Sequence, residues 1–212
     1  MTFDAIMVGS GVLWTIAYLL IIRRGFLDRT YGMPLVALCA NLSWEFIFSF
    51  VHPHDLPQRA VNVVWFSFDL VILLQLLLYG PREFADLPRR AFYAVLALAL
   101  AASFGVVLAV TYEFDDFDGV YSAFGQNLMM SVLFIAMLRS RGSLRGQSVG
   151  IALSKMGGTA LAAFAFYFHN PDYAGSVLLP LLYVTTLVFD GIYAGAVIVL
   201  RRQKKHNNSL AG

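Results

Sequence analysis

The sequence predicts an all-α membrane protein: one bundle of seven transmembrane helices, with the N-terminus outside and the C-terminus in the cytoplasm. Three observations predict this class, namely the bulk composition, the length of the apolar segments and the alternation of charge between the loops. Of 212 residues, 59% are hydrophobic and only 13% are charged, and the mean hydropathy is +0.70. Soluble domains contain fewer apolar and more charged residues, so lipid must be the main solvent of this chain.

Seven apolar segments are each roughly 18–25 residues long, the length that a hydrocarbon core about 30 Å thick requires. They comprise residues 5–22, 33–51, 60–79, 90–112, 120–138, 148–168 and 174–200. Most glycines and prolines that break helices lie between these segments, but Pro180 lies within the seventh and is expected to kink it. We expect a single domain over residues 1–200, followed by a disordered, basic cytoplasmic tail over residues 201–212.

The loops alternate in charge along the chain. The first, third and fifth loops and the tail hold most of the arginines and lysines, whereas the fourth loop holds only acidic charges. Because cytoplasmic loops are rich in Lys and Arg, the odd-numbered loops and the tail are placed in the cytoplasm. A miscounted span would invert this pattern downstream, so the alternation supports the count of seven.

Ionisable side chains deep within the membrane are costly, and they mark functional sites by default. The candidates here are Glu45, Asp69, Lys155 and Asp190. Each shares a helix face with other polar or aromatic residues, and such faces must turn inward. The neighbours that we assign to the same site are Asn41, Trp44, Trp65, Phe124, Asn127 and Tyr193. At ~1.5 Å per residue, the three carboxyls are expected at one depth, roughly 16–18 Å from the inner edge.

This arrangement predicts acid chemistry in an apolar chamber. Two close carboxyls in a low dielectric do not both ionise easily, so at least one should hold its proton at neutral pH. Such an acid, aimed into an aromatic cavity, is a Brønsted acid for a hydrophobic substrate. Asp69 also has a structural reading, in which it pairs with Lys155 or accepts a hydrogen bond from a neighbouring hydroxyl.

Other site types are less well supported. The acidic run 113–118 resembles a magnesium–diphosphate site, but a solvated loop explains it equally well. The histidines at 52, 54 and 169 lack the close spacing of metal ligands. Neither a Walker loop nor a dinucleotide fingerprint occurs, so no nucleotide or nucleic-acid partner is indicated.

Short motifs along nearly the whole chain resemble those of a known family. These motifs are Asn41-Leu42-Ser43-Trp44-Glu45, Trp65-Phe66-Ser67-Phe68-Asp69, Asn127 with Met130-Ser131, Arg145-Gly146-Gln147-Ser148, Gly158-Thr159 and Asp190-Gly191-Ile192-Tyr193. In this order they are similar to the small integral-membrane terpene cyclases of fungal meroterpenoid and indole-diterpene pathways, which also have bacterial relatives.

The resemblance implies a seven-helix fold and a cation–olefin cyclisation that begins when an epoxide or terminal alkene is protonated. It implies two acids as proton donors, at the positions of Glu45 and Asp190, and neither a metal nor another cofactor. Asp69 or Asp190 is then a candidate for the base that removes the final proton. The expected substrate is a hydrophobic linear prenyl or prenylated small molecule held within the lipid bilayer.

The leading hypothesis is therefore a membrane-embedded terpene cyclase, located in the plasma membrane if the chain is a bacterial relative. The rival hypothesis is a seven-helix transporter or lipid-binding protein that uses the same carboxyls as a proton relay. The sequence gives neither the oligomeric state nor the identity of the substrate.

Overall fold

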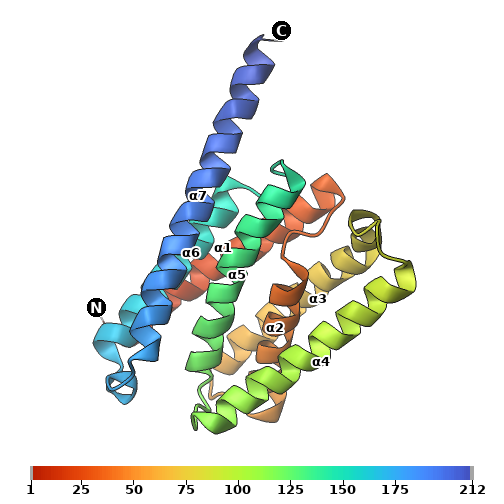
Figure 1. Cartoon of the computed structure of the whole chain (residues 1–212). Helices are drawn as coiled ribbons and strands as arrows, with labels where there is room; N and C mark the ends of the chain where they lie inside the picture. The colour runs from red at the N-terminus through yellow and green to blue at the C-terminus, as the bar shows by residue number, and fades with distance from the viewer. Residues whose placement is uncertain (1, 211–212) are drawn as a thin grey trace.

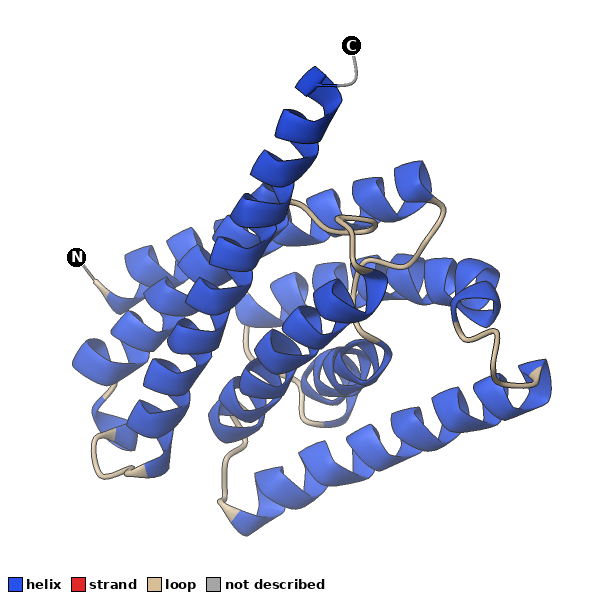
Figure 2. Cartoon of the chain, turned by 45° about the horizontal axis from the view of Figure 1, so that its top comes forward, coloured by secondary structure: helices blue, strands red, loops and turns tan. Residues whose placement is uncertain are grey.

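The computed structural model describes residues 2–210, except for the side chains of 208–210, and this part of the chain is helical without any strand (Figure 1; Figure 2). The α-helices are α1 (Phe3–Asp28), α2 (Leu35–Phe46), α3 (Gln58–Glu83), α4 (Arg89–Glu113), α5 (Val120–Arg141), α6 (Val149–His169) and α7 (Leu178–Leu210). A π-helix, η1 (Ile47–Val51), continues α2, and a 3-10 helix, η2 (Pro171–Tyr173), precedes α7. The all-α class predicted from the sequence is confirmed.

Six of these helices, all except α2, are long and apolar enough to cross a membrane. The apolar stretch Leu35–Val51, formed by α2 and η1, is shorter. The chain is thus a multi-pass membrane protein, while the seventh span and the placement of the two termini stay predictions.

The short helix α2 lies inside the bundle. Every residue of α2 from Leu35 to Glu45 is buried except Val36, and the helix packs against α3, α4 and α5. A helix that is buried on all sides is surrounded by protein instead of lipid, so its length need not match the bilayer. The π-helical turn follows directly after Glu45 and Phe46, and π-helical turns occur frequently at functional sites.

The last helix departs from the prediction at its start. The predicted kink at Pro180 is wrong, because α7 begins only at Leu178 and the proline lies in its first turn. A proline there removes an N–H that has no partner within the helix. At the other end, α7 continues through the basic segment to Leu210, whereas residues 211–212 lie outside the described part. The division into a domain and a tail stays a prediction.

Hydrogen bonds between the loops define two ends of the bundle. At one, which we call the basic end, the α1–α2 and α5–α6 loops meet the end of α3. There Arg141 donates from Nε and Nη2 to Glu83 Oε2 over 3.1 and 2.7 Å, and Nη2 also donates to the Tyr31 carbonyl at 3.0 Å. Arg145 lies 3.3 Å from Glu83 Oε1, and the Thr30 hydroxyl donates to the same oxygen. A single carboxylate therefore joins four segments.

The opposite end, which we call the acidic end, holds the start of α1 and the loops before α3, α5 and α7. Asp116 joins two of these loops, since it accepts hydrogen bonds from the Tyr173 hydroxyl and the Tyr121 amide, both at 2.7 Å. Part of the acidic run thus has a structural role, because Asp116 is buried and both of its oxygens have partners.

The network around Glu83 generates a prediction about stability. Replacing Glu83 with Gln leaves Arg141, which is largely buried, without a full counter-charge, and such a loss costs about 3 kcal/mol. We expect the thermal midpoint in detergent to fall by about 5–10 °C. The control is Asp86→Asn, an exposed carboxylate three residues along, which should melt like the wild type. Equal midpoints for the two variants would contradict this account.

Candidate active site

A cavity of about 1380 Å³ runs from the acidic end to the middle of the bundle. Its walls come from α1, α2, α3, α5 and α6, together with the loops before α3 and α5, and α4 and α7 contribute no residue. Its lining extends toward the basic end no further than Tyr18, Glu45 and Met130. Beyond that level lies the main hydrophobic core, which includes the fully buried Leu38, Ile72 and Phe134.

A carboxyl pair closes the inner end of the cavity. The Tyr18 hydroxyl donates to Glu45 Oε1 at 2.7 Å, lies 3.4 Å from Asp69 Oδ2, and accepts from Asn41 Nδ2 at 2.7 Å. The Tyr18 hydroxyl thus links the two carboxyl groups. Glu45, Asn41 and Tyr18 line the cavity, whereas Asp69 lies behind them. Glu45 is thus the member of the pair that a bound molecule would meet.

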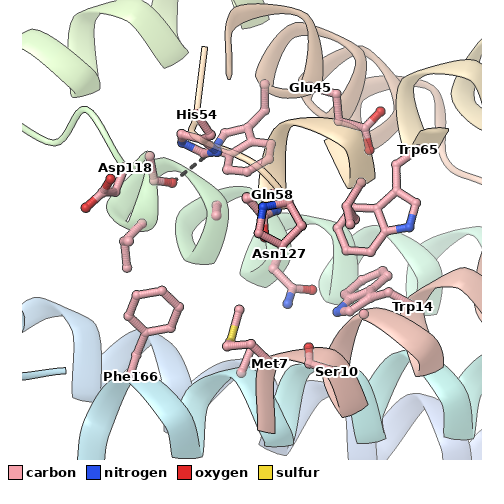
Figure 3. A pocket seen from close by; sticks show the side chains of 18 of the residues that line it. Met7, Ser10, Trp14, Glu45, His54, Gln58, Trp65, Asp118, Asn127 and Phe166 are labelled. Atoms are coloured by element: carbon pink, nitrogen blue, oxygen red, sulfur yellow. Dashed lines mark hydrogen bonds between the residues drawn. The ribbon is translucent and has the colours of Figure 1, made fainter. Parts of the chain in front are cut away.

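Indole rings line the cavity from its inner end toward the acidic end. The chain has three tryptophans, Trp14, Trp44 and Trp65, and all three line the cavity. Trp44 donates its ring N–H to the Gly119 carbonyl at 2.9 Å, and Trp65 donates to the Thr15 hydroxyl at 3.1 Å. These bonds fix the orientation of both rings. Figure 3 shows Glu45, Trp65 and Trp14 gathered at one end of the cavity, with His54 and Asp118 at the other.

Two glycines allow the indoles to pack this closely. Gly119 has φ +67°, and an added Cβ would lie 2.4 Å from the Phe48 ring and 2.8 Å from the Trp44 nitrogen. At Gly158, an added Cβ would lie 2.7 Å from Trp14. This explains why a glycine precedes Thr159 in one of the motifs noted above.

The loop residue His54 covers the acidic end of the cavity. Its ring stacks on Phe48 with centroids 4.8 Å apart and meets Trp44 edge-on. Asn62 Nδ2 lies 3.1 Å from its Nδ1. Burial lowers the pKa of His54 below its ordinary value of 6.5 and outweighs the opposite effect of Asp118. The imidazole is therefore held in its neutral form.

The fourth intramembrane ionisable group, Lys155, pairs with Asp190 and not with Asp69. Lys155 Nζ donates to Asp190 Oδ1 at 2.7 Å, to Ser131 Oγ at 2.7 Å and to Asn127 Oδ1 at 2.8 Å. Both charged side chains are almost completely buried. Asn127 in turn donates from Nδ2 to the Thr159 hydroxyl at 2.9 Å.

Six of the nine residues that we assigned to the site from the sequence line this cavity: Glu45, Asn41, Trp44, Trp65, Phe124 and Asn127. Asp69, Asp190 and Tyr193 do not. The expectation that the second, third and seventh helices converge on the site is corrected here, because α7 packs on α5 and α6, outside the cavity. Tyr193 instead packs in the core against Phe134, with ring centroids 5.2 Å apart.

The sequence patterns did not predict that α1 contributes to the cavity wall. Trp14 and Tyr18 both line the cavity, and Tyr18 is the hydrogen-bond partner of Glu45. A signal was present, because Ser10, Trp14 and Tyr18 recur every four residues and so share one helix face. Such a pattern is usually interpreted as an aromatic stripe on an apolar helix. That interpretation assigns no role to the Tyr18 hydroxyl.

Comparison with known proteins identifies the family. The model of the Pyr4-like transmembrane terpene cyclases matches residues 1–203. The chain belongs to this family. As a Pyr4-like cyclase it is an enzyme, which confirms the terpene cyclase predicted from the sequence and disfavours the transporter. Its substrate is accordingly of the hydrophobic prenyl type.

Similar curated proteins are fungal cyclases. The Pyr4-family terpene cyclase mfmH of Annulohypoxylon moriforme is 31% identical over 88% of this chain and 78% of its own length. Terpene cyclase macJ of Penicillium terrestre is 30% identical over 95% of this chain and 83% of its own length. Asnovolin H synthase nvfL of Aspergillus novofumigatus is 30% identical over 90% and 83%. These fungal sources give no support to the bacterial membrane that we considered. No solved structure matches this Pyr4-like chain.

The buried His54 predicts how stability depends on pH. The pKa of His54 is lower in the folded than in the unfolded chain. Its contribution to the free energy of unfolding is therefore fully present above pH 6.5 and is lost as the pH falls below that value. Between about pH 7 and about pH 5, the thermal midpoint of the wild type should fall more than that of His54→Phe, which keeps the ring stacking. His169→Phe, at an exposed position, should fall as the wild type does. A His54→Phe variant with the wild-type pH dependence would refute this.

Proposed function

We propose that this Pyr4-like cyclase protonates an epoxide or a terminal alkene of a linear prenyl or prenylated substrate and so starts a metal-independent cation–olefin cyclisation. One observation carries the proposal: of the three intramembrane carboxyls, only Glu45 lines the cavity, and it does so at the end where Trp14 and Trp65 lie (Figure 3). We assign the role of general acid to Glu45.

The partners of Glu45 fit this role. Two buried carboxyls that share the Tyr18 hydroxyl do not both ionise easily in a low dielectric, so one of them holds a proton. Tyr18 donates to Glu45 Oε1, while Oε2 has no partner among the described residues. A proton on Oε2 is thus not held by any other described side chain, and we assign it as the proton that the substrate receives. After transfer, the Tyr18 O–H stabilises the carboxylate that is left.

The walls fit a carbocation. Once the substrate is protonated, positive charge moves along its chain, and water would quench it. Indole faces attract cations most strongly among the aromatic side chains, and each contact stabilises the charge by about 0.5–2 kcal/mol. Phe124 adds an aromatic wall on the α5 side, where its ring meets Tyr183 with centroids 4.4 Å apart. These rings also exclude water.

The membrane arrangement completes the proposal. We infer seven spans, with α2 and η1 as a short central span, the N-terminus outside and the basic end in the cytoplasm. Asp69, linked to Glu45 through the Tyr18 hydroxyl, is the candidate for returning the proton to it. Independence from metals is part of the proposal and is tested by chelation: full activity of treated membranes is expected, and loss would contradict it.

The test of the acid uses conservative substitutions. Membranes that contain the protein should convert an epoxidised or linear prenylated substrate into a cyclic isomer of unchanged mass, or into an alcohol one water heavier. Glu45→Gln removes the proton but keeps the shape, and we expect activity to fall by about 10²–10⁴-fold, the usual contribution of a general acid. Product is measured by chromatography with mass detection.

The Tyr18→Phe variant distinguishes a residue that supports Glu45 from the residue that donates the proton. It removes a hydrogen bond to Glu45 and leaves the carboxyl in place, so we expect a smaller loss of activity than in Glu45→Gln, about tenfold for one charge-assisted bond. Glu113→Gln, at an exposed position beyond the cavity, should match the wild type and controls for expression. A folded Glu45→Gln variant with full activity would falsify the assignment.

A further inference from the structure

The Lys155–Asp190 ion pair lies directly behind the cavity wall. Lys155 contacts two residues that line the cavity: Asn127, through a hydrogen bond of 2.8 Å, and Trp14, whose ring centroid is 5.6 Å from Nζ. Asp190 lies on the far side of the lysine, on α7, which contributes nothing to the cavity. The ammonium group is therefore nearer to a bound molecule than its counter-ion.

All three N–H groups of this ammonium are used. Two go to neutral oxygens on α5, those of Asn127 and Ser131, and the third goes to Asp190. Among these hydrogen-bond partners, Asp190 alone carries negative charge. It neutralises Lys155, and its position fixes the lysine against the amide of Asn127.

Such a pair has a consequence for a reaction that passes through a cation. An unbalanced positive charge one side chain behind the wall would repel a carbocation in the cavity, and low polarity strengthens that repulsion. Paired with Asp190, Lys155 leaves little net field there. The same geometry gives Asp190 no direct approach to the substrate, because Lys155 and Asn127 lie between them.

We propose that Asp190 serves cyclisation as a positioning residue that neutralises Lys155 and holds it against Asn127, and that it does not donate a proton to the substrate. This inference rests on the proposed cation chemistry. It departs from the role implied for Asp190 by its resemblance to the family motif. Lys155 and Asp190 then act together as one neutral, positioning ion pair.

Charge-removing double variants test the proposal. Asp190→Asn alone leaves an unbalanced ammonium, so we expect kcat to fall by about 100-fold or more, with KM changed little. Adding Lys155→Gln restores neutrality and keeps donors for Asn127 and Ser131, and kcat should return to within about tenfold of the wild type. Lys155→Met with Asp190→Asn is a second neutral pair, in case the first fails to fold.

Thr186→Val is the matched control. Thr186 is fully buried on α7, one turn before Asp190, and its hydroxyl has no partner among the described residues. The variant should keep wild-type activity and melting. A folded, neutral double variant that is as inactive as Asp190→Asn overturns the proposal, because the carboxyl itself is then required.

A binding measurement separates electrostatics from folding. The probes are farnesyl dimethylamine, which is protonated at neutral pH, and the neutral hydrocarbon of the same shape. Asp190→Asn should bind the amine about tenfold or more weakly than the wild type while binding the hydrocarbon equally well, and the double variant should restore amine binding. Equal losses for both probes would show a merely structural role and overturn the proposal.

Different results would contradict the proposed function and the role given to Asp190. If the wild type forms no cyclic product, or if Glu45→Gln is fully active, the proposed function fails, whatever the amine binding shows. If the wild type cyclises its substrate and Glu45→Gln does not, but the neutral double variants stay inactive when folded, only the role given to Asp190 fails.

Discussion

The constraint on which this structure depends is that an ionisable group within hydrocarbon must find a partner inside the protein. Leaving such a group unpaired costs several kcal/mol, about half the stability of a typical domain. The chain meets this constraint with two separate groups of side chains. Glu45, Asp69, Tyr18 and Asn41 share hydrogen bonds at the inner end of the cavity, and Lys155, Asp190, Asn127 and Ser131 share others across α5, α6 and α7. The helix packing is arranged around these two groups.

The two groups differ in chemistry because they differ in charge. The first contains two acids and no base, so a proton held within it can be given to another molecule. The second contains one acid, Asp190, and one base, Lys155, so the two charges cancel and the group is not expected to transfer a proton. We therefore propose unlike roles for intramembrane carboxyls of similar predicted depth, with the nearest neighbour of each deciding between them.

Sequence patterns predicted the helices well because hydropathy and charge alternation are strong signals in membrane proteins. They also placed Asn41 on one helix face with Trp44 and Glu45, and Trp65 on one face of the next helix with Asp69, because residues three and four apart share a helix face. They did not show which faces meet. Asp190 was expected near Glu45 from its depth and from the family resemblance, but depth gives the height of a residue and not its lateral position in the bundle. Tyr18 was missed because its pattern is that of any aromatic residue in an apolar helix.

The basic end, held by Glu83 and Arg141 beneath the hydrophobic core, closes the cavity on that side. In the proposed mechanism, a molecule that enters from the acidic end reaches Glu45 with its leading tip, and any bulky group trails behind it toward that end. The ring system proposed to form there is more rigid than the chain that came in, and on this path it leaves past the same residues. Departure of the product is then a problem of fitting a stiff body past Trp44 and His54, so the shape of the mouth influences which products the enzyme can release as well as which substrates it admits.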